Sequence, residues 1–346
     1  MRRFLVFAAL TLAALAGVAW SLAGAYQGFT TEAFVDIPRG TGSVGMAGLL
    51  AESGVIRYRW QFLAVRALRP RAKLLAGEYD FRRPASPWEI FDRLARGDVF
   101  FYQLSVPEGQ NIFDIAASVD RLGVISGAQF LEAARDASSI RDLAPQARTL
   151  EGFLFPDTYR ITKHATASDL CLQMTDRFRR AWAELRTTEP PLAAATLASL
   201  IEKETGLAEE RPMVASVFRN RLRLGMPLDC DPTAIYAALL DGRFRGEISR
   251  SDLESRNLYN TYQYAGLPPG PIANPGLEAL KAAVNPADTK YLFFVARPDG
   301  SGAHVFSEKL EAHQRAVSKY RRENQKANKA GTSGPVSRGK AARAPR

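Results

Sequence analysis

Two carboxylates, Glu202 and Glu204, lie near the end of a segment from 193 to 206 whose residue pattern is typical of a helix. Three apolar residues precede Glu204 at the spacing of one helix face: Leu197, Leu200 and Ile201. Because side chains at this spacing share a face, Glu204 should lie on the apolar side of the helix. Glu202 is rotated by about 200° from Glu204 around the helix axis. The two carboxylates are therefore expected in different environments.

A position on the apolar face would suit Glu204 to general acid catalysis. Apolar surroundings disfavour the ionised form of a carboxyl group and so raise the pKa of such a group. Cleavage of a glycosidic bond needs a carboxylic acid, still protonated near neutral pH, that can protonate the leaving oxygen. The alternative interpretation is that Glu204 only ends the helix, with its head group in solvent.

Further polar residues recur in short motifs on either side of this helix. The segments are Glu151–Tyr159 (EGFLFPDTY), Ala198–Thr205 (ASLIEKET), Asp231–Thr233 (DPT), Asn260–Tyr262 (NTY) and Gly266–Ile272 (GLPPGPI). In order and spacing, this set resembles the MltG (YceG-like) family of endolytic murein transglycosylases. The resemblance covers roughly 151–306 and extends more loosely back to Phe34. Any one motif alone would be weak, because Glu-Lys-Glu is common on helices and Pro-Pro-Gly is an ordinary turn.

The resemblance implies a particular reaction. The family's catalytic glutamate matches Glu204, which the helical pattern also selects. Lytic transglycosylases consume no water, because the C6 hydroxyl of muramic acid attacks C1 and closes a 1,6-anhydro ring; one carboxyl group can then act as acid and afterwards as base. The expected function is cleavage of the β-1,4 bond between MurNAc and GlcNAc in nascent peptidoglycan, which terminates glycan elongation and needs no cofactor. A hydrolytic muramidase and a non-catalytic glycan-binding scaffold are the alternatives.

Four polar residues of the motifs are candidates for holding the sugar: Asp157, Asn260, Tyr262 and Glu151. Oriented polar groups are needed to position the substrate and to stabilise positive charge at C1. Each residue also has a structural interpretation. Asp157 and Asn260 are typical turn residues, and Tyr262 could be a packed aromatic of the core. Glu151 could equally be a surface residue.

Metal sites and nucleic-acid binding are not expected. The chain has three histidines and two cysteines, and none stands at the spacing of metal ligands. The formal net charge is +10, but residues 319–346 carry nine Lys and Arg against one Glu, so the rest is nearly neutral. A nucleic-acid-binding domain usually carries its basic patch on a folded face. Cys171 and Cys230 are expected as two buried thiols, with a disulfide as the alternative in an oxidising compartment.

The N-terminus carries a candidate membrane anchor. No charged residue occurs from Phe4 to Thr31, whereas spanning the hydrocarbon of a bilayer takes about 20 apolar residues. Arg2 and Arg3 precede this run, so the positive-inside rule keeps the N-terminus in the cytoplasm. We expect a single-pass protein of the cytoplasmic (inner) membrane with an extracytoplasmic catalytic domain. The alternative is a signal peptide cleaved near the Ala-Gly-Ala at 23–25.

An α+β fold with several parts is expected around these sites. Residues 1–27 form the cytoplasmic stub and transmembrane anchor, and 33–106 are predicted as strand, helix, helix and strand, an order that resembles a LysM-like module. Residues 107–323 are predicted as the mainly helical YceG-like catalytic domain, and 324–346 as a disordered basic tail. LysM modules bind glycan chains, and a structural spacer is the alternative. The family resemblance further implies peptidoglycan glycan strands as substrate and peptidoglycan synthases as partners.

Local patterns also predict where elements begin. Ser86 and Glu89 form a capping-box pattern, and the pairs Asp231-Pro232 and Asn274-Pro275 each resemble an N-cap followed by proline at the first helical position. A glycine-rich turn between 291–296 and 303–307 predicts a β-hairpin.

Overall fold

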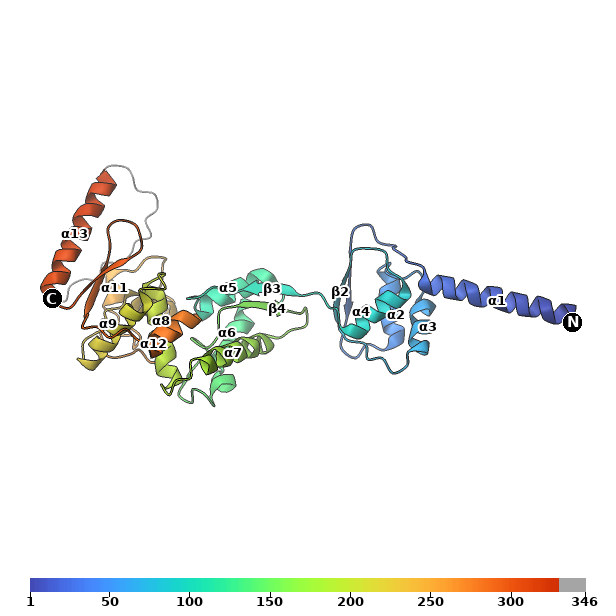
Figure 1. The fold of residues 1–346 in the computed structure, drawn as a ribbon, viewed down its shortest axis with the longest axis horizontal. Coiled ribbons are helices and arrows are strands. Elements are labelled where there is room, and N and C mark those ends of the chain that lie inside the picture. Colours follow the sequence, from blue (N-terminus) through green and yellow to red (C-terminus); the bar gives the residue numbers. More distant parts are fainter. Residues whose placement is uncertain (330–346) are drawn as a thin grey trace. The chain divides into compact units, whose positions relative to one another are not determined.

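The computed structural model describes residues 1–329, which form two compact units (Figure 1). Unit 1 comprises Met1–Gln103 and Arg160–Ala165, and unit 2 comprises Leu104–Tyr159 and the described residues from Thr166 onward. Helices combine with three two-stranded sheets, so the predicted α+β class is confirmed. Unit 1 thus includes 160–165 in addition to most of the predicted module of 33–106.

Unit 1 contains a two-stranded sheet and four helices. Its elements are α1 (Arg2–Ala23), β1 (Ala33–Ile37), α2 (Ser43–Glu52), α3 (Arg59–Leu68), β2 (Gly77–Phe81) and α4 (Pro87–Arg96). β1 and β2 pair antiparallel, with Val35 opposite Tyr79. The core contains the fully buried rings of Phe62, Tyr79 and Phe91. From β1 to β2, the predicted order of strand, helix, helix and strand is confirmed.

Unit 2 is mainly helical. Its helices are α5 (Ile112–Leu122), α6 (Gly127–Arg135), the 3-10 helix η1 (Ala137–Ile140), α7 (Ala167–Glu184), α8 (Pro191–Glu204), α9 (Arg211–Arg223), α10 (Asp231–Leu240), α11 (Arg250–Leu253), α12 (Leu277–Val284) and α13 (Leu310–Lys329). The predicted hairpin is confirmed as β5 (Phe293–Ala296) and β6 (His304–Ser307), which pair antiparallel. A further sheet pairs β3 (Tyr102–Ser105) with β4 (Thr158–Ile161), and the division between the units crosses both strands.

Helix α8 is surrounded by other elements of unit 2. Every residue from Ala194 to Ile201 is buried, and α8 packs against α9, α10 and α12. Small residues at several of these positions let the neighbouring helices approach closely. Ser199 accepts a hydrogen bond of 3.0 Å from the N–H of Ile272, which ties the 266–272 motif to α8. This packing fixes the position of Glu204, the last residue of the helix.

Three predictions about helix ends need correction, although the capping box of Ser86 and Glu89 is confirmed. Helix α10 begins at Asp231 itself, with Cys230 as N-cap. Helix α12 begins only at Leu277, because the amide of Asn274 is engaged in long-range hydrogen bonds instead of a cap. Helix α13 continues through 324–329 of the predicted tail, where no glycine or proline interrupts it. The rest of that tail, 330–346, lies outside the described residues.

Candidate active site

Glu204 lies in a pocket of unit 2. Helices α9 and α10, strand β5 and two loops supply the other lining residues: Phe218, Arg221, Leu228, Asp229, Asp231, Tyr262 and Phe294. Glu204 is partly buried there, next to aromatic and aliphatic side chains. The structure therefore places this carboxylate in a pocket with both apolar and charged walls, and Glu202 is not among the lining residues.

A thiol contacts the Glu204 carboxylate directly. The Sγ–H of Cys230 donates a hydrogen bond of 3.1 Å to Oε1 of Glu204. Burial, followed by the negative charge of Glu204 and this hydrogen bond, raises the pKa of the Cys230 thiol well above its usual value. Cys230 therefore remains a protonated, neutral donor. Cys171 is likewise a free, buried thiol, so the prediction of two thiols is confirmed over the disulfide.

Two threonines join the motifs around this thiol. The N–H of Cys230 donates to Oγ1 of Thr261 at 3.1 Å, and the hydroxyls of Thr261 and Thr233 lie 2.9 Å apart. The N–H of Thr261 in turn donates to Oγ1 of Thr233 at 3.2 Å. All three residues are buried. The Asp-Pro-Thr and Asn-Thr-Tyr motifs are thus held together directly beside Glu204.

Tyr262 and Asp231 form a second contact in the pocket. The phenol of Tyr262 donates a hydrogen bond of 2.5 Å to Oδ1 of Asp231. Burial raises the pKa of Tyr262, and the carboxylate of Asp231 raises it further. The phenol therefore stays protonated, and its ring forms part of the pocket wall. Of the four sugar-contact candidates, Tyr262 is the one that the structure places with Glu204.

Arg221 and Asp229 form the charged part of the wall. Nη1 of Arg221 donates to Oδ2 of Asp229 at 3.2 Å, and Nε donates to the carbonyl of Leu292 at 2.7 Å. Burial lowers the pKa of Arg221, although Asp229 opposes the shift. Asp229 has a φ of +50°, an unusual backbone conformation for a residue other than glycine. These contacts hold the guanidinium of Arg221 and the carboxylate of Asp229 at a defined place in the pocket.

Glu202 has different surroundings from Glu204. Its Oε1 accepts a hydrogen bond of 2.8 Å from Arg211, and its Oε2 accepts one of 2.9 Å from the N–H of Gly276. Its side chain is only 5% exposed, and that of Arg211 is 9% exposed. Burial raises the pKa of Glu202, and the bonds from Gly276 and Arg211 oppose this. Glu202 therefore joins α8 to α9 and to the start of α12.

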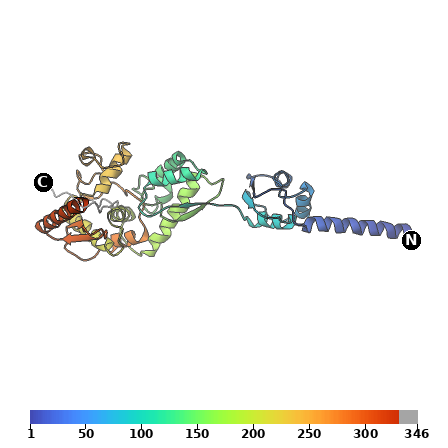
Figure 2. The same ribbon diagram turned by 90° about the horizontal axis from the view of Figure 1, so that it is seen from above.

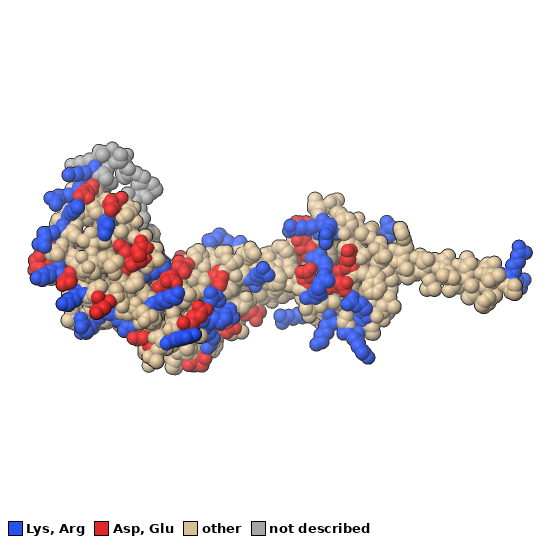
Figure 3. Space-filling view, in the orientation of Figure 1, with Lys and Arg blue, Asp and Glu red and all other residues tan. Residues whose placement is uncertain are grey.

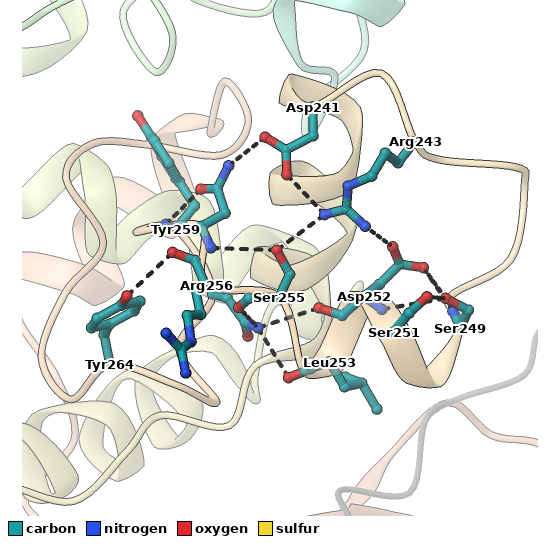
Figure 4. A network of polar contacts seen from close by, with 12 residues as sticks. Asp241, Arg243, Ser249, Ser251, Asp252, Leu253, Ser255, Arg256, Tyr259 and Tyr264 are labelled. Atoms are coloured by element: carbon teal, nitrogen blue, oxygen red, sulfur yellow. Dashed lines mark hydrogen bonds and ion pairs between the residues drawn. The ribbon is translucent and has the colours of Figure 1, made fainter.

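Asn260 lies behind the pocket wall rather than among the lining residues. Its Nδ2 donates to the carbonyls of Leu253 at 3.0 Å and Ser255 at 2.8 Å, and its Oδ1 accepts from the N–H of Tyr262 at 3.1 Å. Figure 4 shows the surrounding network of α11, in which Arg243 bonds both Asp241 and Asp252. Asn260 is fully buried, so it holds the backbone of Tyr262 in place.

Glu151 lies in the core of unit 2. Its Oε2 accepts hydrogen bonds from the N–H of Ile112 at 3.0 Å and the phenol of Tyr236 at 2.9 Å, and its Oε1 accepts one of 2.8 Å from Asn274. Burial raises the pKa of Glu151 to about 8, although the hydrogen bonds oppose the shift. Asn274 also accepts from the N–H of Gly152 at 2.8 Å. Glu151 is thus buried, and the alternative interpretation of Glu151 as a surface residue is wrong.

Asp157 also lies outside the Glu204 pocket. It lines a shallow depression with the following residues of unit 2: Ser105, Val106, Pro107, Glu108, Pro156 and Thr158. Partial burial would raise the pKa of Asp157, but the N–H of Thr158 and the guanidinium of Arg177 outweigh it and hold the pKa below its usual value. Arg177 donates to Oδ2 at 2.8 Å. Asp157 is therefore an ionised residue in a salt bridge.

Sequence reasoning missed several residues of the pocket. Arg221, Phe218 and Phe294 carry no local pattern that distinguishes them from other helix and strand residues. Cys230, which does not line the pocket but contacts Glu204, is predicted from the sequence only as a buried thiol. Only Cys230 stands next to a motif, since it precedes Asp231. Among residues 1–329, no group of three or more His, Cys, Asp or Glu side chains could hold a metal ion.

A helix-borne glutamate beside a neutral donor, in a pocket of aromatic and charged side chains, is an arrangement suited to acid–base chemistry. The model of the YceG-like family matches residues 35–319, and the chain belongs to this family. An endolytic murein transglycosylase of Bacillus subtilis (strain 168) is 30% identical over 311 residues, which cover 84% of this chain and 85% of that protein.

Two further relatives support the same assignment. An endolytic murein transglycosylase of Streptococcus pneumoniae serotype 2 (strain D39) is 27% identical, and the match covers 83% of this chain and 58% of that protein. The crystal structure of a YceG-like protein from Listeria monocytogenes superimposes with a TM-score of 0.56 at 30% identity. That match covers 83% of this chain and 99% of the Listeria chain.

Proposed function

We propose that this protein is an endolytic lytic transglycosylase of peptidoglycan, with Glu204 as its catalytic acid and base. The observation that carries the proposal is the contrast between the two carboxylates at the end of α8. Glu202 is bound to Arg211, whereas Glu204 lies in the pocket and accepts a hydrogen bond from a neutral thiol. A carboxyl group that lines a pocket can reach a bound glycosidic oxygen and carry the proton that cleavage requires.

The reaction begins with the protonated carboxyl of Glu204. It gives its proton to the oxygen between MurNAc C1 and GlcNAc C4 as the C1–O bond breaks, and positive charge develops at C1. The ionised Glu204 then accepts the proton of the MurNAc C6 hydroxyl while O6 bonds to C1. The products are a 1,6-anhydro-MurNAc end and a GlcNAc hydroxyl, so no water is consumed. Glu204 ends the cycle protonated again.

The neighbouring groups give this carboxyl a fixed orientation. The thiol of Cys230 holds Oε1, and it stays protonated through the cycle because its pKa is raised. Asp231 and Asp229, the other carboxylates of the pocket, are bonded to Tyr262 and Arg221. These negative groups would stabilise the positive charge that develops on the sugar. Tyr262 is the proposed sugar contact, and Asn260 positions it. The sugar contacts predicted for Glu151 and Asp157 would have to form away from the Glu204 pocket.

Analysis of the products tests the reaction. Glycan strands incubated with the full chain should yield ends that mass spectrometry identifies as 1,6-anhydro-MurNAc, lighter by one water molecule than a reducing end. Fragments of intermediate length should appear early, as expected for an endolytic enzyme. Reducing ends would instead identify a hydrolytic muramidase, and binding without cleavage would identify a scaffold.

We further propose that α1 spans the cytoplasmic membrane and that both units lie outside the cytoplasm. Helix α1 is long and apolar enough to cross a bilayer. Its last turn belongs to unit 1, since Gln61 donates to the carbonyl of Ser21 at 3.0 Å and Leu22 is only 5% exposed. Cleavage of a signal peptide at 23–25 would remove these contacts, which favours a retained anchor. A mature protein that begins after residue 25 would contradict it.

For unit 1 we propose a LysM-like glycan-binding role, supported by its order of strand, two helices and strand. The test compares the full chain with a variant that lacks 34–106, on polymeric and on short glycan. Weaker binding to the polymer, with little change on the short substrate, is the expected result. Equal losses on the polymeric and the short glycan would indicate a structural spacer. Peptidoglycan synthases remain proposed partners, as the resemblance implies, and crosslinking in cells would identify them.

A further inference from the structure

The end of α1 is joined rigidly to unit 1. Nε2 of Gln61, in α3, donates to both the carbonyl and the hydroxyl of Ser21, at 3.0 and 2.9 Å. Leu22 is part of the hydrophobic core of the unit. Helix α1 also packs against α4. Because these contacts hold the last turn of α1 from two sides, the helix cannot swing freely about its end.

The chain that follows α1 adds further contacts. Tyr26 and Ala85 exchange two backbone hydrogen bonds, and the N–H of Gly28 donates to the carbonyl of Gly54 at 2.8 Å. A Cβ at Gly54 would lie 2.9 Å from the carbonyl carbon of Gly28, so only glycine permits this close approach. The segment after α1 is thus tied to the loops before α3 and α4, and it does not act as a flexible linker.

Helix α3 carries an exposed apolar face beside this junction. Phe62 and Val65 point into the core, whereas three exposed apolar residues at i, i+7 and i+8 form what we call the junction face: Trp60, Ala67 and Leu68. Trp60 is 42% exposed and Leu68 65% exposed. Single exposed apolar residues are ordinary, but a row of them on one helix face usually has a partner.

The junction face lies at the end of unit 1 from which α1 leaves. Figures 1 and 2 agree in placing α3 at this end, and Figure 1 shows it running across the direction of α1. The sheet of β1 and β2 lies at the other end of the unit (Figure 1). Arg57 and Arg59 stand next to the junction face and are both exposed. Arg59 pairs with Glu52, but both side chains are more than half exposed, so the pair holds it weakly.

The length of α1 sets the height of this surface above a bilayer. From Phe4 to Ala23 the helix measures about 30 Å, the thickness of the hydrocarbon layer. Trp20, which is 82% exposed, lies about one turn before the end of this length, close to the interfacial layer where tryptophan is enriched. Since α3 is bonded to Ser21, one residue further on, its exposed face must lie close to the same layer. In Figure 3 the visible side of α1 shows basic side chains only at its N-terminal tip, as expected for a span.

We propose that α3 is an interfacial helix whose junction face inserts into the headgroup layer of the phospholipid leaflet from which α1 emerges. Trp60 and Leu68 would enter the boundary between headgroups and acyl chains, and Arg57 and Arg59 would pair with lipid phosphates. This inference rests on the proposed span of α1. It makes unit 1 a membrane-seated part of the protein rather than a module on a loose tether.

Spin labels on the full chain in lipid nanodiscs test the proposal. The variants are Leu68→Cys in the junction face, Phe34→Cys in β1 as a matched exposed apolar control, and Leu12→Cys within α1. The native cysteines are buried in unit 2, and the labelled wild type gives their background. A label at 68 should collide with a water-soluble nickel chelate at least roughly fivefold less often than one at 34, with oxygen collisions maintained.

The two proposals can fail separately. Equal nickel accessibility at 68 and 34, with a protected label at 12, would leave the span intact and refute the interfacial helix. A label at 12 that is open to nickel would refute the span, and the interfacial helix with it. A second variant, Trp60→Glu with Leu68→Glu, should abolish the protection of a label at Ala67→Cys while the protein still folds, because all three residues lie on the surface.

Discussion

Replacing each of the two glutamates at the end of α8 by glutamine should produce opposite effects. Glu204→Gln keeps the shape of the side chain, and its amide oxygen can still accept the hydrogen bond from Cys230. The amide cannot deliver a proton near neutral pH, so cleavage should fall by at least ~10²-fold. This corresponds to roughly 2.7 kcal/mol of transition-state stabilisation. Because Glu204 is only partly buried, the melting temperature should change little.

Glu202→Gln should instead destabilise unit 2 and spare the chemistry. Breaking a buried ion pair costs about 3–5 kcal/mol when one charge is left without a partner. Arg211 would keep Glu108, which lies at 3.5 Å, and glutamine would retain one acceptor, so we expect roughly 2–3 kcal/mol. For a unit of this size, that lowers the melting temperature by roughly 4–12 °C. Cleavage per folded molecule should stay near that of the wild type.

The assay measures both quantities on the same preparations. Anhydro-MurNAc ends released from glycan strands are counted by liquid chromatography and mass spectrometry, and unfolding is followed by circular dichroism. Near wild-type release of anhydro ends by Glu204→Gln, together with an inactive but fully stable Glu202→Gln, would exchange the two roles and refute the argument from helical phase. If both variants remain active, another carboxylate must be the acid, and Glu151 or Asp157 would be removed next.

Three further predictions concern the groups around Glu204 and in the core. Cys230→Ala should lower kcat by about fivefold with little effect on KM, since a weak donor to a charged group contributes about 1 kcal/mol. Cys230→Ser should restore most of the rate. Equal rates for the wild type and both variants would show that the thiol has no positioning role. Burial raises the pKa of Glu151 in the folded protein to about 8, above the pKa of the same carboxyl in the unfolded chain. The stability that results from this shift is fully present below the unfolded pKa and is lost as the pH rises toward 8. The melting temperature of the wild type should therefore fall between pH 5 and 8 more steeply than that of Glu151→Gln, and parallel curves would contradict the assignment. Asn260→Ala removes the amide donor to the partly buried carbonyl of Ser255 and one of the two side-chain donors to that of Leu253, so chemical denaturation should show a loss of roughly 1–3 kcal/mol. The cleavage rate should also fall, whereas a stable and fully active variant would remove the role of Asn260 behind Tyr262.

Features that depend on neighbouring residues were predictable. The helical period places Glu202 and Glu204 on different sides of α8. In the structure Glu202 binds Arg211, and Glu204 lines the pocket. The capping box at Ser86 and the hairpin of β5 and β6 are equally local. Each is determined within a few residues of sequence, so the pattern alone contains the information.

Features that depend on distant residues were not predictable. Asn274 has the local pattern of an N-cap, yet its amide accepts hydrogen bonds from the N–H groups of Gly152 and Leu154, more than 100 residues away. A packed core rewards such a contact because buried N–H groups need acceptors, and nothing near Asn274 in the sequence indicates the partner. The same holds for Cys230, whose thiol meets Glu204 only after α8 and α10 have packed.

The motifs therefore contribute to one site in two physical ways. Three of them converge directly, because Glu204, Cys230 beside Asp231, and Thr261 are linked in a continuous series of hydrogen bonds. The 151–159 motif acts from the core instead. Gly152 has a φ of +86°, and a Cβ there would lie 2.2 Å from the ring of Pro271, so the glycine lets the 266–272 segment pack closely. That segment bonds α8 through Ser199, and the motif farthest from the acid thus helps to fix the helix that carries it.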